Sequence, residues 1–404
     1  MTGAGKSDWP VVALTIMAGI TAAAHIGKAP PALPLLRAEL GLSIVEAGWI
    51  ISIIAAMAMA TGMAAGMVAD RIGHRRLLII GLAIMAISSA AGSFANGSEL
   101  LLTSRFLEGI GFISIAVAGP SLIIMSILPR HRQVVLGVWS TWVPAGIALS
   151  MFISPLILGP LGWRPLWVFW GGLTAILVVV LIGKRPSPPT LAQGEQPRHS
   201  FRGSLRLILR RPGPLLLAVN FGLFAAQWGS IMMWLPSFMV DQRGLAVSSA
   251  AVLSGLIVMC NVPGNLSGSW LLHRGIERSH MIAGGHLMMG ACAIGIFSNL
   301  LPDGARFGLA LLFSYSAGFV PPAMFASVPV HAPSHQQFGA TSGLLLQGSN
   351  FGNFFGPPAV AAVVAAFGAW DHVLWLVLGC AGGGIGLALW LVRVERRLSA
   401  TQLT

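Results

Sequence analysis

Four side chains that can carry charge or exchange protons lie inside long apolar stretches of this 404-residue chain. His25 and Lys28 are three residues apart in the first stretch, and Arg105 and Glu108 are three residues apart in the fourth. A charged side chain at the centre of a bilayer costs about 2.5–3.5 kcal/mol on insertion scales, so such residues are usually paired, functional or both. The two cations can bind an anion, and the imidazole and the carboxyl group can move protons.

The positions of these residues along their helices place them at one depth. Lys28 is seven residues from Leu35, and Glu108 is eight from Leu100, at the ends that we expect on the outer side. At 1.5 Å of rise per residue, both lie roughly 10–12 Å below that surface. Arg105, three residues before Glu108, lies on nearly the same helix face. We therefore predict one cluster of two cations and one acid, with one positive charge left over for a small anion.

Two interpretations of this cluster remain open. In the first, Lys28 and Arg105 bind a substrate anion, and Glu108 couples transport to a proton because protonation neutralises it. In the second, the three side chains form a purely structural ion-pair cluster. His25 can relay protons, since imidazole titrates near physiological pH, or it can be a hydrogen-bonded packing residue.

Composition and charge indicate a polytopic membrane protein. Hydrophobic residues make up 55% of the chain and charged residues 9%, with a mean hydropathy of +0.80, which no soluble domain can bury. The net charge of +12 is spread over loops without interleaved aromatics, so we expect no nucleic-acid partner. Cys260, Cys292 and Cys380 lie in apolar stretches and predict neither disulfides nor a metal site. No nucleotide-binding G-x-x-x-x-G-K-[ST] motif and no Ser/His/Asp arrangement is present, so we expect no cofactor and no enzyme activity.

Twelve apolar stretches are long enough to cross the hydrocarbon core as helices. They cover residues 10–36, 46–68, 77–95, 100–128, 134–158, 165–183, 213–240, 248–272, 281–301, 306–330, 339–367 and 371–392. Most of the 24 Lys and Arg residues lie on the same side as the two termini. The positive-inside rule therefore predicts a multi-pass protein of the inner (plasma) membrane with both termini cytoplasmic.

The chain divides into two bundles, residues 1–183 and 214–404, joined by a cytoplasmic linker at 184–213. The linker contains four prolines, so it cannot form one helix. Its last part, residues 201–211, predicts either a short basic amphipathic helix on the membrane surface or a solvated segment.

The two halves repeat at an offset of 202 residues. The offset relates Gly66 to Gly268, Gly73 to Gly275, Pro34 to Pro236, Pro120 to Pro322, Gly137 to Gly339, Gly146 to Gly348, Pro155 to Pro357 and His25 to Gln227. Gly and Pro are common in this chain, but so many matches in one register indicate an internal duplication.

One short loop carries a motif. It reads G-x-x-x-D-R-x-G-H-R-R and contains Gly66, Asp70, Arg71, Gly73 and Arg75. It resembles the G-x-x-x-D-[RK]-x-G-[RK]-[RK] loop between helices 2 and 3 of the major facilitator superfamily, from which it departs only at His74. The pattern of apolar stretches extends the resemblance over nearly the whole chain, and helices 1, 4 and 5 more faintly resemble the cyanate and organic-anion branches. The resemblance implies an all-α membrane protein of 12 transmembrane helices in two pseudo-symmetric six-helix halves, with this loop gating conformational change and a monomer sufficing.

The same resemblance implies a substrate site between the halves, near mid-membrane and lined by helices 1, 4, 7 and 10. In the second half the candidates for substrate contact are neutral: Gln227, Trp228, Tyr315 and, in the eleventh stretch (339–367), Asn350. We therefore predict a secondary active transporter that works by alternating access and carries a small organic or inorganic anion with a proton.

Two other functions are compatible with parts of this pattern. The alternative transporter is a proton-driven exporter of a hydrophobic drug or metabolite, but helix 5 does not match the G-x-x-x-G-P-x-x-G-G segment of drug antiporters well. A receptor or scaffold without transport would need a sizeable soluble segment, and the longest stretch outside the predicted helices is the 184–213 linker.

Overall fold

The computed structural model describes residues 7–184, 207, 210–298, 300–333 and 337–402. Side chains at 62–67, 70, 133 and 397–402 fall outside that description. Most of the predicted linker, including nearly all of the amphipathic segment at 201–211, therefore lies outside the described residues. Twelve spans within the described ranges are long and apolar enough to cross a membrane, which confirms the predicted number.

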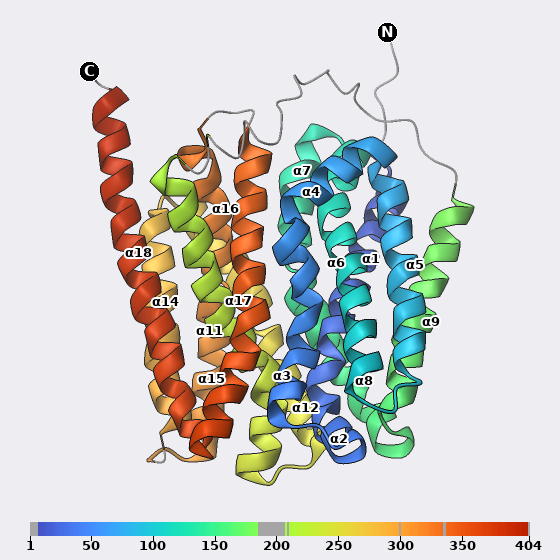
Figure 1. Ribbon diagram of the computed structural model, residues 1–404. Coiled ribbons are helices and arrows are strands. Elements are labelled where there is room, and N and C mark those ends of the chain that lie inside the picture. Colours follow the sequence, from blue (N-terminus) through green and yellow to red (C-terminus); the bar gives the residue numbers. More distant parts are fainter. Residues whose placement is uncertain (1–6, 185–206, 208–209, 299, 334–336, 403–404) are drawn as a thin grey trace.

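The first half contains ten helical segments (Figure 1). They are α1 (Trp9–Gly27), α2 (Ala29–Leu40), α3 (Ile44–Ser52), η1 (Ile53–Ala55), α4 (Ala56–Ile72), α5 (His74–Gly92), α6 (Ser98–Ser126), α7 (Pro129–Trp139), α8 (Trp142–Leu161) and α9 (Trp163–Gly183). The second half contains α11 (Pro212–Arg243), α12 (Val247–Met259), α13 (Asn261–His273), α14 (Arg278–Phe297), α15 (Asp303–Ala317), α16 (Val320–His331), α17 (Phe338–Phe367), η3 (Trp370–His372) and α18 (Val373–Gln402). Helix α1 begins and α18 ends at the same end of the bundle (Figure 1).

Five of the predicted single runs are interrupted: 46–68 is interrupted at η1 without a proline, and the other four are each divided into two helices at breaks that proline explains. Proline lacks the N–H that bonds to the carbonyl four residues earlier, and its ring crowds that carbonyl. Helix α1 gives way to α2 before Pro31, α7 to α8 before Pro144, α12 to α13 before Pro263, and α15 to α16 before Pro322. Each break lies within one residue of the carbonyl that loses its partner, and neighbouring helices can accommodate such kinks inside a membrane bundle.

The same helix pairs pack in both halves, as the internal repeat predicts. In the first half α1 packs on α8, and α5 packs on α6 and α9; in the second, α11 packs on α17, and α14 packs on α15 and α18. Gly146 and its repeat partner Gly348 both lie against backbone of the neighbouring helix, where an added Cβ would overlap the carbonyl oxygen of Ile20 or Ala218. Gly73 and Gly275 share positive φ angles of 90° and 88°.

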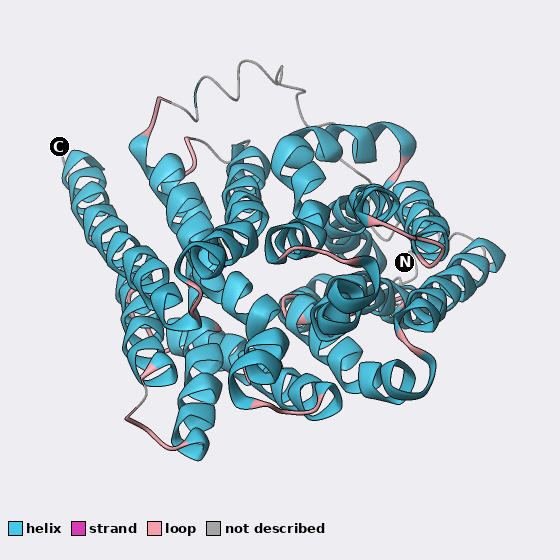
Figure 2. Cartoon of the chain, turned by 60° about the horizontal axis from the view of Figure 1, so that its bottom comes forward, coloured by secondary structure: helices cyan, strands magenta, loops and turns pink. Residues whose placement is uncertain are grey.

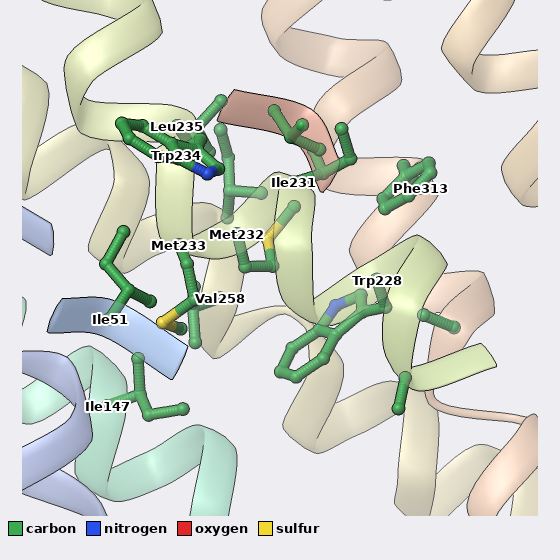
Figure 3. Close-up of a cluster of buried hydrophobic side chains, with 14 of the residues drawn as sticks. Ile51, Ile147, Trp228, Ile231, Met232, Met233, Trp234, Leu235, Val258 and Phe313 are labelled. Atoms are coloured by element: carbon green, nitrogen blue, oxygen red, sulfur yellow. The ribbon is translucent and has the colours of Figure 1, made fainter. Parts of the chain in front are cut away.

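The halves meet at the end of the bundle away from the termini, which Figure 2 brings forward. There α8 packs on α12, α2 on α11, and α3 on α17. Ile51 and Ile147 of the first half share one buried hydrophobic cluster with Met233 and Val258 of the second (Figure 3).

Two further contacts join the halves at this end. An added Cβ at Gly48 on α3 would lie 3.1 Å from the Cβ of Ala361 on α17. Arg37 on α2 forms an ion pair of 3.8 Å with Asp241 on α11. Toward the termini, α4 still packs on α17. Helices α7 and α13, which are the parts of these spans nearer the termini than α8 and α12, have at most marginal contact with each other over their described residues. The two halves are thus held together mainly at one end.

Candidate functional site

The break between α1 and α2 places Lys28 inside the first bundle. Pro30 and Pro31 supply no N–H to the carbonyls of Ile26 and Gly27, so α1 ends there and Lys28 stands between two helices. Its own backbone N–H still bonds to the Ala24 carbonyl oxygen at 2.9 Å. The Lys28 side chain is fully buried.

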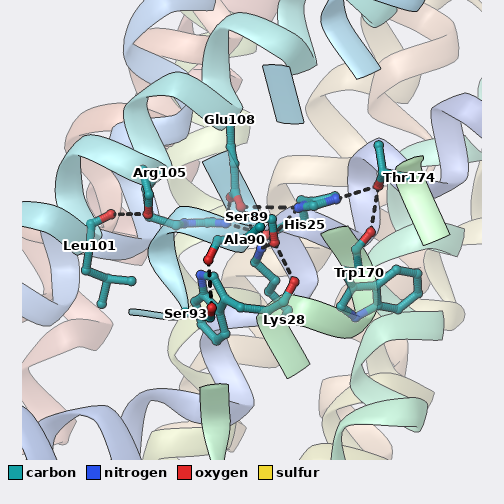
Figure 4. Close-up of polar contacts among 12 residues, drawn as sticks. His25, Lys28, Ser89, Ala90, Ser93, Leu101, Arg105, Glu108, Trp170 and Thr174 are labelled. Carbon is teal, nitrogen blue, oxygen red and sulfur yellow. Dashed lines mark hydrogen bonds and ion pairs between the residues drawn. The ribbon is translucent and has the colours of Figure 1, made fainter. Parts of the chain in front are cut away.

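Glu108 on α6 is the centre of the buried cluster (Figure 4). Its Oε1 atom lies 2.6 Å from Nζ of Lys28, and its Oε2 atom lies 2.5 Å from Nη1 of Arg105, one turn earlier on the same helix. The Nδ1 atom of His25 lies 3.3 Å from the same Oε1 and 3.0 Å from Nζ of Lys28. All four side chains are fully buried. The sequence predicted a cluster of Lys28, Arg105 and Glu108, and the structure brings these three together, with His25 beside them.

Two hydroxyl groups also contact the cluster directly. Nζ of Lys28 donates to Oγ of Ser89 on α5 at 2.7 Å, and that hydroxyl donates to the Trp167 carbonyl oxygen. Nε2 of His25 lies 2.9 Å from Oγ1 of Thr174 on α9, which donates to a backbone carbonyl of its own helix. Nζ of Lys28 also lies 4.8 Å from the centre of the Trp167 ring, a cation–π contact. The cluster therefore ties α1, α5, α6 and α9 together.

Arg105 has more donors than partners. Its Nε donates to the Ile50 carbonyl oxygen at 3.2 Å, and Nη1 donates to the His25 carbonyl oxygen at 2.5 Å as well as to Glu108. Its Nη2 atom is buried and has no hydrogen-bond partner. With Lys28 and Arg105 charged, Glu108 ionised and His25 neutral, the cluster carries one net positive charge. An excess charge and an unpartnered guanidinium nitrogen in a buried site are both costly, and both favour an anion.

The predicted residues of the second half each hydrogen-bond within that half. Gln227 on α11 is fully buried against His286, at 2.8 Å. Nε1 of Trp228 donates to Oγ of Ser314 at 3.2 Å, and the indole belongs to the shared hydrophobic cluster (Figure 3).

The remaining two candidates are half-buried. The Tyr315 hydroxyl donates to Oγ of Ser267 at 3.0 Å. Nδ2 of Asn350 donates to the Leu346 carbonyl oxygen of its own helix at 2.8 Å. Substrate contact by these residues stays a prediction.

Several polar residues of both halves were missed by the sequence analysis. His286 lies in the middle of an apolar stretch, and its position alone should have marked it, since ionisable residues inside spans are rare. Asn220 contacts it from α11. Ser89 and Thr174 could not have been chosen, because Ser and Thr are common in membrane helices and often bond only to their own backbone.

The motif loop is partly described. Gly66 and Asp70 lie in α4, and the Asp70 side chain is outside the described residues. Gly73 ends α4 with a φ of 90°, a conformation that favours glycine. Arg71 is exposed, whereas Nη2 of Arg75 donates to the carbonyl oxygens of Leu181 and Lys184, both at 2.5 Å. Arg75 therefore holds the end of α9 beside the start of α5.

Comparisons with known proteins agree with the fold. The family model described as Major Facilitator Superfamily matches residues 11–344. The "Probable 4-methylmuconolactone transporter" of Cupriavidus pinatubonensis is 28% identical over 226 residues, which are 54% of this chain and 52% of the relative. The "Niacin transporter NiaP" of Acinetobacter baylyi is 29% identical over 295 residues, which are 63% of this chain and 64% of the relative. The chain thus spans about half to two thirds of the length of these relatives.

A solved structure covers nearly the whole chain. The crystal structure of a bacterial homolog to the human lysosomal transporter Spinster, in an inward-facing and unoccupied conformation, matches with a TM-score of 0.75. The match covers 96% of this chain and 95% of that chain at 18% sequence identity, so it shows a shared fold. The family model covers most of the chain and the architecture agrees with it: the chain belongs to the Major Facilitator Superfamily.

Proposed function

We propose that this chain is a secondary active transporter that carries a small organic anion together with a proton by alternating access. The observation that carries the proposal is the buried cluster of Lys28, Arg105 and Glu108, which sets two basic side chains against one acid and leaves Nη2 of Arg105 without a partner. An uncharged or cationic cargo could not take the place of the Glu108 carboxylate beside Lys28 and Arg105.

Binding of an anion together with a proton would leave the net charge of this cluster unchanged. The empty cluster, with Glu108 ionised, carries one positive charge. When Glu108 takes up a proton and a monocarboxylate takes its place beside Lys28 and Arg105, the cluster again carries one positive charge. One carboxylate replaces another as the partner of the same two cations, so neither state has to bury an additional net charge.

The two relatives described above support an organic anion. Niacin and 4-methylmuconolactone, the compounds in the names of the two relatives, both bear a carboxyl group. Because each match covers only part of the relative, we carry over the chemical class and not the compound. Trp228 and Tyr315 would supply apolar and aromatic walls from the second half.

The proposal includes an orientation in the membrane and a division into two domains. The excess of Lys and Arg on the side of the termini supports cytoplasmic termini in an inner (plasma) membrane. The contacts of α8 with α12 and of Arg37 with Asp241 would then close the outer end. Residues 1–183 and 214–404 would rock against each other about the 184–213 linker, with the Gly66–Arg75 loop as a gating element and a monomer as the working unit.

The cluster is closed in this conformation, since its side chains are fully buried. An anion reaches it only if helices of the first half, or the two halves, move apart. Alternating access supplies such a movement, and protonation of Glu108 would weaken the ion pairs that hold the cluster together.

Uptake into proteoliposomes tests the proposal. A panel that pairs each carboxylate with its neutral amide, such as nicotinate with nicotinamide, is offered with and without an inwardly directed proton gradient. We expect the gradient to drive uptake of at least one carboxylate but not of its amide. Uptake of both partners to the same extent contradicts an anion site, and gradient-driven export of a neutral hydrophobic compound favours the alternative exporter.

A further inference from the structure

A second buried imidazole lies in the other half of the molecule. His286 stands in the middle of α14 and is fully buried. Its Nδ1 atom lies 2.8 Å from Oε1 of Gln227, and its Nε2 atom lies 3.1 Å from Oδ1 of Asn220; both amides come from α11. Gly384 on α18 makes room for the ring, because a Cβ added there would lie 2.5 Å from three of its atoms.

The orientation of Asn220 decides the state of one ring nitrogen. Nδ2 of Asn220 donates to the Gly384 carbonyl oxygen at 2.7 Å, so its Oδ1 atom must be the one that faces the ring. An amide oxygen only accepts hydrogen bonds. Nε2 of His286 must therefore carry a proton.

Gln227 presents a second acceptor to the other ring nitrogen. With Oε1 toward Nδ1, the contact is a hydrogen bond only if Nδ1 is also protonated, and a ring with both nitrogens protonated is an imidazolium. In this orientation Nε2 of Gln227 is buried without a partner. Half a turn of the amide would bring Nε2 to Nδ1 and suit the neutral ring. The proton on His286 and the orientation of Gln227 are therefore linked.

We propose that His286 is a second proton-binding site of this protein, with Asn220 as its fixed acceptor and Gln227 as the amide that turns when the proton arrives or leaves. The site is separate from the Glu108 cluster and does not depend on an anion binding there. Gln227 is the repeat partner of His25. This position on the first helix is thus a buried imidazole in one half and an amide that contacts a buried imidazole in the other.

The surroundings set the character of this site. The charged and titratable side chains on the described parts of the packed helices are Arg278, His280 and Cys292 on α14, Asp241 and Arg243 on α11, Asp303, Arg306 and Tyr315 on α15, His331 on α16, and Cys380, Arg393, Glu395 and Arg396 on α18. The charged ones lie toward helix ends; Arg278, eight residues away, is roughly 12 Å along the axis. The charged His286 ring would thus be stabilised by two amide oxygens and not by a carboxylate. The proton proposed for the first half differs, because it binds to the Glu108 carboxylate itself.

Magnetic resonance of the whole protein, labelled with ¹⁵N-histidine and reconstituted in lipid, tests the proposal without a transport assay. The ring-nitrogen signal that disappears in His286→Gln belongs to His286. We expect it to change from a neutral tautomer to an imidazolium within the pH range in which the protein stays folded. In Gln227→Leu, which lacks the second acceptor, the imidazolium fraction at a given pH should fall several-fold.

Two glycine variants provide a matched comparison. Gly384→Ala drives a methyl group into the His286 ring, whereas an added Cβ at Gly382, on the same helix, meets nothing within 4 Å. The His286 signal should change in Gly384→Ala and stay as in the wild type in Gly382→Ala. A His286 ring that remains one neutral tautomer at every pH at which the protein is folded, in wild type and Gln227→Leu alike, overturns the proposal. That result would leave the anion proposal untouched, because the Glu108 cluster plays no part in it.

Discussion

Nζ of Lys28 lies 2.6 Å from Oε1 of Glu108, and neither side chain is exposed. Breaking a buried ion pair by removing one partner leaves an uncompensated charge and typically costs about 3–5 kcal/mol. Glu108→Gln leaves both Lys28 and Arg105 without an acid, so we expect a loss of stability of about that size, measured by denaturant unfolding in detergent. Asp241→Asn, which breaks the half-exposed pair with Arg37, is the control and should cost at most about 1 kcal/mol.

Double variants with the net charge of the wild type test whether net charge governs the stability of the cluster. Arg105→Gln/Glu108→Gln and Lys28→Met/Glu108→Gln each keep the single net positive charge of the wild type. Both should unfold at higher denaturant concentration than Glu108→Gln alone, since each double variant leaves one cation without an acid and Glu108→Gln leaves two. A double variant that is no more stable than Glu108→Gln would show that net charge does not govern the stability of the cluster.

The glycines of α17 offer a test of close helix packing. At Gly348 an added Cβ would overlap backbone of Ala218 on α11, whereas at Gly339 it would meet nothing within 4 Å. Gly348→Ala should therefore destabilise the protein by about 1–3 kcal/mol, as overpacking does. Gly339→Ala should be neutral or stabilise by up to about 1 kcal/mol, the difference in helix propensity. Equal thermal unfolding of the two variants would contradict the close approach of α11 and α17.

A disulfide between the halves tests whether they separate during transport. The added Cβ at Gly48 and the Cβ of Ala361 are 3.1 Å apart, close enough for a disulfide after a small adjustment. In Gly48→Cys/Ala361→Cys we expect oxidation to cross-link α3 to α17 and stop transport, and reduction to restore it. Gly48→Cys alone is the control, because the chain also contains Cys260, Cys292 and Cys380. Full transport by the cross-linked protein would rule out opening at this end.

Arg75 and Arg76 form a matched pair in the motif loop. Arg75 donates to the carbonyl oxygens of Leu181 and Lys184, whereas Arg76 is exposed. In Arg75→Ala the end of α9 loses both hydrogen bonds from Nη2, so its amides should exchange with deuterium at least several-fold faster. In Arg76→Ala the exchange rate there should stay as in the wild type. The same rate in both variants would mean that Arg75 does not hold α9.

The sequence predicts the spans and the first-half cluster for physical reasons that act locally. Bilayer thickness sets the length of the apolar stretches, and the rise of a helix places Lys28 and Glu108 at one depth before any packing is known. The breaks beside Pro31, Pro144, Pro263 and Pro322 were not predicted, because a membrane helix can bend at proline or end there, and neighbouring helices decide which.

Long-range contacts of the cluster and of the second half were not predictable in the same way. That Ser89 bonds to Lys28, or Thr174 to His25, depends on how α5 and α9 rotate against α1. Gln227 was predicted to contact substrate, yet its Oε1 faces His286 from another helix, and the space for that ring comes from Gly384 more than 150 residues away in the chain. The repeat related Gln227 to His25 but gave no indication that the second imidazole would come from α14.

The central claim is that an anion and Glu108 exchange places beside the same two cations. It is tested most directly by the number of protons taken up when the carboxylate that binds tightest in the panel binds to the purified protein, obtained by calorimetry in buffers with different ionisation heats. The wild type should take up one proton per anion, and Glu108→Gln, which keeps both cations, should bind the anion without proton uptake. No proton uptake by the wild type, or the same uptake by Glu108→Gln, would contradict the account.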